Sequence, residues 1–375
     1  MAFLKTLLAG SAGLAALLLA WSMPPTRVAQ AQPSPVAPKA PPSRTGPVTA
    51  AEWPALLAQG KRTGVIDLGD RQVIDLPRTI QSDTPLTIRG GRFGPVELEN
   101  WRNVILDGGR FEASSGAAEY QYLLAAFDAE NLTIRNAHFS GYEMPNGMLM
   151  VRGPSIRGGH NVTIEHSTIE HLAGFSNFIR TNGARFADND LRDMREGLEV
   201  QGARNIVIER NRFEKFRPFE GDHADAIQFF TTGLTQPGDT AAQDVTIRDN
   251  LMLLDSKAQG VFAGDEINIA GTPKGYARFV IENNIIVGAG WHGITTAFTD
   301  GLTVRNNRLG RIAGQDIYDS RINVDGSSVV VEGNEANDFI YHNKLTESRN
   351  KKAGERPAAD FEKMADEWVK RFRPG

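Results

Sequence analysis

A short apolar pattern recurs along most of this chain and limits what it can fold into. Each copy reads apolar-x-x-Gly/Asn-x-apolar, so its two apolar residues stand five positions apart. The intervals between copies range from 18 residues (Ile88 to Leu106) to 39 residues (Ile208 to Ile247). Repeats of this length, built from short β-branched runs without helical periodicity, predict a β-solenoid. The apolar pairs are Ile88/Phe93, Leu106/Phe111, Ile134/Phe139, Ile164/Ile169, Phe186/Leu191, Ile208/Phe213, Ile247/Met252, Ile281/Ile286 and Val304/Leu309, and a weaker copy begins at Val331.

An asparagine often stands three positions after the first apolar residue of a copy. Asparagine suits the corner of a coil because it tolerates left-handed backbone and can stack on its equivalent in the next coil. Leucine-rich repeats have a similar period, but their Leu-x-x-Leu-x-Leu spacing is absent here. The corner asparagines are Asn189, Asn211, Asn250, Asn284, Asn307 and Asn334.

Together, the apolar pairs and the corner asparagines resemble the right-handed parallel β-helix superfamily of pectate lyases, mannuronan C5-epimerases and tailspikes. The resemblance covers about residues 65–345. It implies an all-β fold, a right-handed parallel β-helix of about ten coils. Short helices are expected at both ends, the first near Thr49 to Leu57.

The first residues have the composition of an export signal. Lys5 precedes an apolar run from Leu7 to Trp21, and Ala29-Gln30-Ala31 offers small residues for cleavage. These features predict a secretory signal peptide that is cut after Ala31. An uncleaved membrane anchor is the alternative, although the apolar run is short for a membrane span.

Composition also divides the rest of the chain and limits its partners. Ala358 to Phe372 reads as an amphipathic helix that caps the solenoid, lies back on it or binds a partner. The absence of cysteine excludes disulfides, which suits a bacterial periplasm or a secreted protein. The expected divisions are a signal peptide (1–31), a Pro/Ala-rich linker (32–47), the β-helix (48–345) and a charged segment with the C-terminal helix (346–375).

The net charge of -4 gives no basis for binding nucleic acid, which needs a basic surface. We expect a monomer whose mature form has no membrane span.

The longest interval between copies contains a dense group of titratable residues. Asp222, His223 and Asp225 lie within four residues and run directly into a buried-looking strand around Ile227. Extra residues in a solenoid coil emerge at its surface, often on the binding face. The sequence therefore places this group over a surface where a ligand can bind.

A second strand is expected in each coil after the asparagine corner. In this register the residues before the inward apolar positions are mostly Gly or Ala, and neighbours in a strand point to opposite faces. We therefore expect an outward trough in which an extended substrate lies close to the backbone. The strands are aligned on Ile179, Leu198, Ile227, Val261 and Ile294, and the preceding residues are Phe178, Gly197, Ala226, Gly260 and Gly293.

Polar residues flank the expected trough on both sides. They form a plausible surface for a sugar chain, because adjacent coils lie about 4.8 Å apart. Asn177, Glu196, Asp225, Gln259 and His292 are on one side, and Arg180, Glu199, Gln228, Phe262 and Thr295 on the other.

The group permits removal of a proton next to a carboxylate. Carboxylates beside a histidine hold its tautomer and raise its pKa, so His223 is the expected general base or acid, oriented by Asp225 and Asp222. Abstraction from a uronate also needs a group that stabilises the carbanion. We expect Arg180 to neutralise the substrate carboxylate and Lys257 to be an alternative base. The expected substrate-binding residues are Glu199, Gln228, Phe262, Arg195, Arg217 and His292.

Asp222-His223-Ala224-Asp225 resembles the Asp-Pro-His-Asp signature of mannuronan C5-epimerases, although the proline is missing and the histidine stands one position earlier. The resemblance implies an acid/base role for His223. β-Elimination after proton abstraction would give a lyase, and reprotonation on the opposite face a C5-epimerase. The expected partner is an acidic, uronic-acid-containing polysaccharide.

Two other functions remain open. Polygalacturonases of the same fold use clustered aspartates, Gly-His-Gly and Arg-Ile-Lys, and this chain has Asp222 and Asp225, Trp291-His292-Gly293 and Arg321-Ile322-Asn323 in that order. Such paired carboxylates would support glycoside hydrolysis. The alternative is a non-catalytic polysaccharide-binding or structural β-helix.

No cofactor and no dedicated metal site are expected. Calcium could use oxygens of Asp222, Asp225, Glu196 and Glu199, but the sequence has no contiguous calcium loop.

Overall fold

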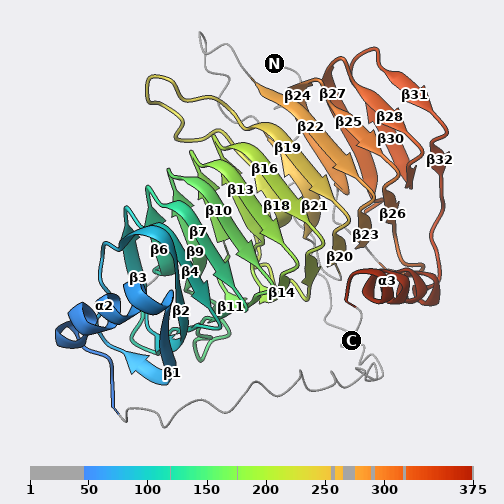
Figure 1. Ribbon diagram of the computed structural model, residues 1–375. Helices are drawn as coiled ribbons and strands as arrows, with labels where there is room; N and C mark the ends of the chain where they lie inside the picture. Colours follow the sequence, from blue (N-terminus) through green and yellow to red (C-terminus); the bar gives the residue numbers. More distant parts are fainter. Residues whose placement is uncertain are drawn as a thin grey trace. The chain divides into compact units, whose positions relative to one another are not determined.

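The computed structural model describes residues 46–118, 120–174, 176–254, 258–264, 275–288, 292–315 and 318–373. The expected signal peptide, most of the expected linker, Lys257 and Trp291 lie outside these residues. The described chain is a stack of coils, each paired in parallel with the next (Figure 1).

The coils build three parallel sheets. Sheet 1 contains β4 (Arg102–Asp107), β7 (Glu130–Arg135), β10 (His160–Glu165), β13 (Asn182–Ala187), β16 (Arg204–Glu209), β19 (Gln243–Arg248), β22 (Tyr276–Glu282), β25 (Thr303–Arg305), β28 (Val330–Glu332) and β31 (Thr346–Ser348). Sheet 2 contains β5 (Arg110–Glu112), β8 (His138–Ser140), β11 (Thr168–Leu172), β14 (Asp190–Met194), β17 (Arg212–Glu214), β20 (Leu251–Leu254), β23 (Ile285–Gly288), β26 (Arg308–Gly310), β29 (Glu335–Ala336) and β32 (Lys351–Lys352). Sheet 3 contains β3 (Val96–Glu99), β6 (Tyr122–Phe127), β9 (Arg152–Arg157), β12 (Ser176–Ile179), β15 (Leu198–Gln201), β18 (Asp225–Phe229), β21 (Gln259–Ala263), β24 (Ile294–Asp300), β27 (Arg321–Ser327) and β30 (Asp338–Tyr341).

The repeated apolar pairs form the core between these sheets, as the sequence predicted. Ile164 in sheet 1 aligns with Phe186, while Ile169 in sheet 2 aligns with Leu191. All four side chains are buried. The spacing of five positions between the two apolar residues therefore corresponds to one corner, at which the chain passes from sheet 1 to sheet 2.

The corner asparagines form a continuous buried ladder. Asn250 Oδ1 accepts hydrogen bonds from the backbone N–H and the side-chain amide of Asn211, at 2.9 and 3.0 Å. Asn250 Nδ2 in turn donates to Ile208 O and Asn284 Oδ1. Because each amide satisfies backbone groups that the corner leaves unpaired, the ladder removes the cost of burying them.

Helices lie at both ends of the described chain. The 3₁₀-helix η1 (Ala50–Glu52) leads into α2 (Trp53–Thr63), which packs Trp53 and Leu56 against the first strands, β1 (Val65–Val73) and β2 (Gln81–Phe93). The C-terminal α3 (Ala358–Phe372) lies back on the solenoid beside sheet 2 (Figure 1). Trp368 is buried there, and its Nε1 donates to Asp249 O at 2.6 Å.

None of the helices in the described ranges is long and apolar enough to cross a membrane.

The column of small residues in sheet 3 is not an open trough, which corrects the expectation from sequence. A Cβ added at Gly260 would collide with the carbonyl oxygen of Gly293 and approach Ile286 Cδ1 to 3.1 Å. A Cβ at Gly293 would collide with the Leu309 side chain, and Ala226 is fully buried. The first three residues of β18 and of β21 are all buried, so Ala226 and Gly260 face the neighbouring coil and the core, and only small residues fit.

We expect Asn250→Ala to destabilise the fold by about 3 kcal/mol or more, because it leaves several buried backbone and amide groups unsatisfied at about 1–3 kcal/mol each. The measurement is the denaturant midpoint. Asn343→Ala, at an exposed asparagine, is the matched control and should change it little. Equal effects of the two substitutions would contradict a structural role for the ladder.

We expect Gly260→Ala to lower the unfolding midpoint strongly, because the added methyl group has no room beside the next coil. Gly94→Ala is the control, since a Cβ at Gly94 meets no atom within 4 Å. A Gly260→Ala protein as stable as the Gly94→Ala protein would show that the column is open after all.

Candidate functional site

Two loops of the longest coil bring the predicted residues to sheet 3. The segment 215–224 precedes β18, which begins at Asp225, and the segment 230–242 follows it. The order of β15, β18, β21 and β24 in sheet 3 is set by parallel pairing. The alignment of Leu198, Ile227, Val261 and Ile294 expected from sequence is confirmed.

This register creates a column of polar side chains across four strands. Asp225 is the direct partner of Gln259. Glu196 stands two residues before Leu198 and His292 two residues before Ile294, so both continue the same column. Neighbours in such a column are about 4.8 Å apart. We call Glu196, Asp225, Gln259 and His292 the polar column.

His223 lies across the polar column and uses both ring nitrogens. Its Nδ1 is 3.1 Å from Asp225 Oδ2, and its Nε2 is 2.8 Å from Gln259 Nε2. Asp225 is 1% exposed, whereas the His223 side chain is 45% exposed. With an amide N–H directed at Nε2, the proton of the neutral ring resides on Nδ1 and is donated to Asp225.

The pKa of His223 results from opposing effects. Burial is the largest single effect and lowers it, but the hydrogen bond to Asp225 and the negative charges of Asp225 and Glu196 together outweigh burial, so the pKa stands above its ordinary value of 6.5. The ring is thus oriented by Asp225 and made more basic by the acidic groups around it.

An aromatic side chain and a second histidine border His223. The Phe262 ring lies edge-on to the His223 ring at 4.7 Å between centroids, and 5.9 Å from the His292 ring. His292 Nδ1 is 2.7 Å from Thr295 Oγ1. Burial, with the charges of His223 and Arg321, lowers the pKa of His292 to about 4, so His292 is neutral.

Glu196 is the acidic group of this site that sequence reasoning did not place among the catalytic candidates. Burial, followed by the nearby carboxylates of Asp225 and Asp222, raises the pKa of Glu196 to about 8. A carboxyl group with such a pKa is mostly protonated at pH 7 and can donate a hydrogen bond. The signal in the sequence was its place beside Asp225 in the expected register, because two acids in adjacent strands repel each other.

The arginines expected to face the substrate are each bound to a carboxylate. Arg195 Nε and Nη2 donate to Asp222 at 2.5 Å each, and the Arg195 guanidinium lies 4.8 Å from the centroid of the Phe219 ring. Asp222 therefore holds the insertion to β14 and does not contact His223 in the way expected. Although burial raises it, Arg195 and the Phe219 N–H hold the pKa of Asp222 below its usual value.

The other two arginines are also in ion pairs. Arg180 donates to both oxygens of Asp239 at 2.7 and 2.8 Å, and Arg217 lies 2.8 Å from Glu143. These contacts tie loops to the coils and leave none of these three guanidinium groups without a carboxylate.

Arg180 also belongs to a different row from the one expected. Ile179 aligns with Gln201, and Ser176 with Leu198, so the sequence alignment was wrong by three residues in this strand. The inward side chain of β12 is Phe178, which is fully buried, while Ile179 is partly exposed.

The remaining predicted residues form a second row beside the polar column. Asn177, Glu199, Gln228, Phe262 and Thr295 align directly across sheet 3, and apart from Asn177 and Thr295 they are partly exposed. We call this the outer row. Lys257, the alternative base, lies outside the described residues.

The described ranges contain no group of three or more acidic or histidine side chains arranged to hold a metal ion. Of the four oxygen donors considered for calcium, Asp222 is held by Arg195.

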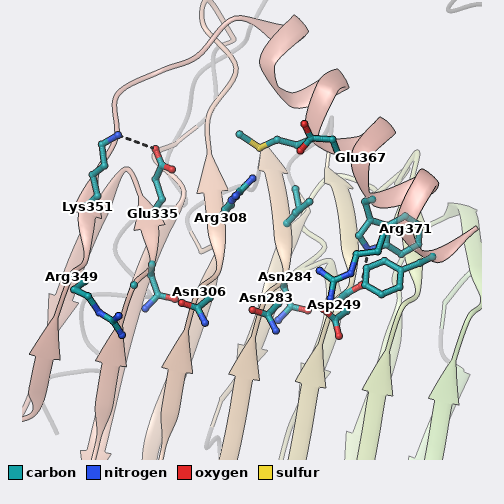
Figure 2. A pocket seen from close by; sticks show the side chains of 16 residues that line it. Asp249, Asn283, Asn284, Asn306, Arg308, Glu335, Arg349, Lys351, Glu367 and Arg371 are labelled. Carbon is teal, nitrogen blue, oxygen red and sulfur yellow. Dashed lines mark hydrogen bonds and ion pairs between the residues drawn. The ribbon is translucent and has the colours of Figure 1, made fainter.

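A cavity of about 650 Å³ lies elsewhere, between α3 and the corners that join sheets 1 and 2 (Figure 2). Arg308, Arg371 and Glu367 line it with Asn283 and Asn306. It contains none of the predicted site residues, so it is separate from the polar column.

Neither a protein-family model nor a curated protein matches this chain. Several solved structures do. The surface adhesin PfbA of Streptococcus pneumoniae gives a TM-score of 0.51 at 12% identity, over 78% of this chain and 82% of that chain. The A-module of the mannuronan C-5 epimerase AlgE6 of Azotobacter vinelandii gives 0.48 at 12% identity, over 82% and 96%.

A tailspike of E. coli bacteriophage HK620, solved with a hexasaccharide, gives a TM-score of 0.54 at 11% identity. The match covers 82% of this chain and 61% of the tailspike, so this chain spans less than two thirds of that protein. At such identities the adhesin and the tailspike show the fold alone. With the stacked coils described above, they identify this chain as a right-handed parallel β-helix protein.

Proposed function

We propose that this protein is an exported enzyme that acts on a uronic-acid-containing polysaccharide by abstracting the α-proton of a uronate, as a lyase or a C5-epimerase. One observation carries the proposal: His223, oriented by Asp225, lies beside Glu196, whose pKa is about 8. A base and a neutral acid in one site are the pair that such chemistry needs.

His223 is the proposed base. Its Nδ1 is held by Asp225, so the proton must arrive at Nε2, which receives the Gln259 amide in the unliganded site. Substrate must therefore displace this amide. The C5–H bond then breaks, Nε2 takes the proton, and the electron pair moves toward the C6 carboxylate, while Asp225 stabilises the imidazolium.

Glu196 takes the role that the sequence had suggested for Arg180. The electron pair raises the negative charge on the substrate carboxylate, and a neutral carboxylic acid can stabilise it by donating a hydrogen bond. From this state, the C4–O4 bond breaks and the C4=C5 bond of a lyase product forms, while the departing O4 takes a proton from the His223 imidazolium or from water. Return of a proton to the opposite face of C5 gives the epimer.

Glycoside hydrolysis is the second candidate, and the same Glu196 favours it. A protonated carboxyl group can donate its proton to a glycosidic oxygen, and Glu199 or Asp225 could act as the second carboxylate. The two candidates differ in what Glu196 does, because hydrolysis consumes its proton whereas proton abstraction uses only its hydrogen bond.

Polysaccharide as the ligand has further support. The polar column and the outer row run along the solenoid axis, which suits an extended chain, and the tailspike of the same fold was solved with a hexasaccharide. The export signal expected from the sequence supports a location in the periplasm or outside the cell. The non-catalytic binding protein remains the outcome if no substrate is turned over.

The first test follows three products on a panel of polyuronates. We expect either unsaturated uronate (ultraviolet absorbance) or exchange of the C5 proton with solvent, and His223→Ala should reduce the rate at least 100-fold. His160→Ala, at an exposed histidine of sheet 1, is the control and should leave the rate unchanged. New reducing ends without absorbance would favour hydrolysis. Full activity of His223→Ala would refute this site.

Glu196→Gln separates the two chemistries. If Glu196 only donates a hydrogen bond, the amide replaces it in part, and the fall in rate as Glu196 ionises near pH 8 should disappear. If Glu196 donates its proton to a leaving group, Glu196→Gln should lose about 100-fold or more at every pH. The measurement is the pH profile of kcat/KM.

Stability provides a check of the Glu196 pKa that does not depend on activity. Because the pKa is raised from 4.5 to about 8, the folded protein keeps a proton that the unfolded chain releases above pH 4.5. The free energy of unfolding should therefore fall as pH rises from about 4.5 to about 8. Glu196→Gln should remove this slope and gain about 1 kcal/mol or more at pH 8. An unchanged slope would contradict the raised pKa.

A further inference from the structure

A cluster of aromatic and cationic side chains lies on sheet 3, on the strands nearer the N-terminus than the polar column. The Arg157 guanidinium is 5.2 Å from the centroid of the Tyr122 ring and 6.0 Å from that of Phe127. Arg152 is also near Tyr122, at 5.6 Å. These residues come from β6 and β9, and sequence reasoning did not identify them because their strands contain no insertion.

Buried hydrogen bonds fix the cluster in place. Arg157 Nε donates to Ser155 Oγ at 3.1 Å, Ser155 Oγ donates to Asn177 Oδ1 at 2.6 Å, and Asn177 Nδ2 donates to the Tyr122 hydroxyl at 3.0 Å. Ser155 is 0% exposed and Asn177 is 2% exposed. The ring and the guanidinium are thus preorganised, which lowers the entropy cost of binding a ligand.

Arg157 differs from the arginines around the proposed active site in its charge partners. Within the part of the chain that the structure describes, Arg157 forms no ion pair with a carboxylate, whereas Arg180, Arg195 and Arg217 each do. Its Nε is used by Ser155, and its two terminal nitrogens carry the remaining donors. A planar guanidinium with these donors matches a carboxylate or a sulfate group.

The cluster lies on the same sheet as the proposed active site. Ser155 aligns with Asn177, Asn177 with Glu199, and Glu199 with Gln228. Ser155 and Asn177 are buried, so the group that this part of the sheet presents to a ligand is the half-buried Arg157, two residues after Ser155. From β9 to β18 there are three strand steps, about 14 Å at about 4.8 Å each. A short oligosaccharide can span that distance.

We propose that Arg157 and the Tyr122 ring form a subsite for an anionic sugar unit of the polysaccharide, about three coils from His223. Arg157 binds the acidic group of the sugar, and the Tyr122 ring beneath its guanidinium holds that guanidinium in position. The choice of polymer and its path past His223 rest on the proposed function. The need for such a cation follows from the proposed active site, where Arg180, Arg195 and Arg217 are already paired with carboxylates.

The test is binding of defined acidic oligosaccharides to the full chain by calorimetry. We expect Arg157→Gln to weaken binding at least 10-fold and Arg157→Lys to weaken it less, since it keeps the charge but loses the planar fork. Arg192→Gln is the matched control, because Arg192 is paired with Glu170 on sheet 2. Carboxyl-reduced and sulfated oligosaccharides show whether the anion is a carboxylate or a sulfate ester, and carboxyl reduction should abolish the difference between Arg157→Gln and the unaltered protein.

Binding and turnover separate this proposal from the proposed function. His223→Ala should bind like the unaltered protein, and Arg157→Gln should raise KM with little change in kcat. If no polymer is turned over but binding depends on Arg157, the subsite is supported and the proposed enzymatic function is wrong. If turnover requires His223 while Arg157→Gln leaves KM and affinity unchanged, the subsite is wrong.

Two further outcomes also decide the matter. No binding of any acidic oligosaccharide by the unaltered protein overturns the subsite, and so does an equal loss for neutral and acidic oligosaccharides. Weaker binding by an Arg157 variant supports the subsite only if the unfolding midpoint of that variant is unchanged. If Arg157→Gln is less stable than the unaltered protein, Arg157→Lys is used for the comparison.

Discussion

Everything in this protein depends on the exact stacking of each coil on the next. Parallel backbone hydrogen bonds form the three sheets, but such bonds alone would tolerate a slip of two residues. The buried asparagine ladder prevents it, because Asn211, Asn250 and Asn284 bind one another and the corner backbone in only one register. The register of the corner then decides which side chains become neighbours in sheet 3.

The same stacking produces opposite electrostatics on different faces. On sheet 1, Glu209 lies among Arg185, Arg210 and Arg248; burial alone would raise its pKa, but these arginines hold it below the usual value. In sheet 3 the register sets Glu196 beside Asp225, and the pKa of Glu196 rises to about 8. The same stack of coils therefore pairs the ionised Glu209 with arginines on sheet 1 and keeps Glu196 protonated in sheet 3.

Much of the fold and part of the site could be predicted from the sequence. The apolar pairs and corner asparagines recur along the sequence, and residues that recur in a solenoid occupy equivalent positions in the core of each coil. The alignment of Leu198, Ile227, Val261 and Ile294 followed from them, and with it the neighbours Asp225 and Gln259.

The remaining features depend on contacts that have no period. The partners of Arg195 and Arg180, namely Asp222 and Asp239, come from the two loops of the longest coil, and nothing in the spacing pairs them. The glycine column was misread because the first three residues of β18 and of β21 are all buried, so the alternation of inward and outward side chains does not hold there. Ile179 was misaligned because Phe178 fills the core in that coil.

The charges along sheet 3 separate the residues proposed to react with the substrate from those proposed to bind it. The proposed site combines the basic His223 with the acids Asp225 and Glu196, and the nearby Arg195 and Arg180 are paired with Asp222 and Asp239 of the insertion, so it offers little attraction to a polyanion. Contacts of the polysaccharide with regular coils outside the insertion can compensate for this weak attraction. Binding energy gained at such a distance can still be used to position the reacting sugar. The insertion in one coil supplies the reactive residues of the proposed site. The asparagine ladder fixes the register of the coils and so fixes the position of these residues relative to Arg157.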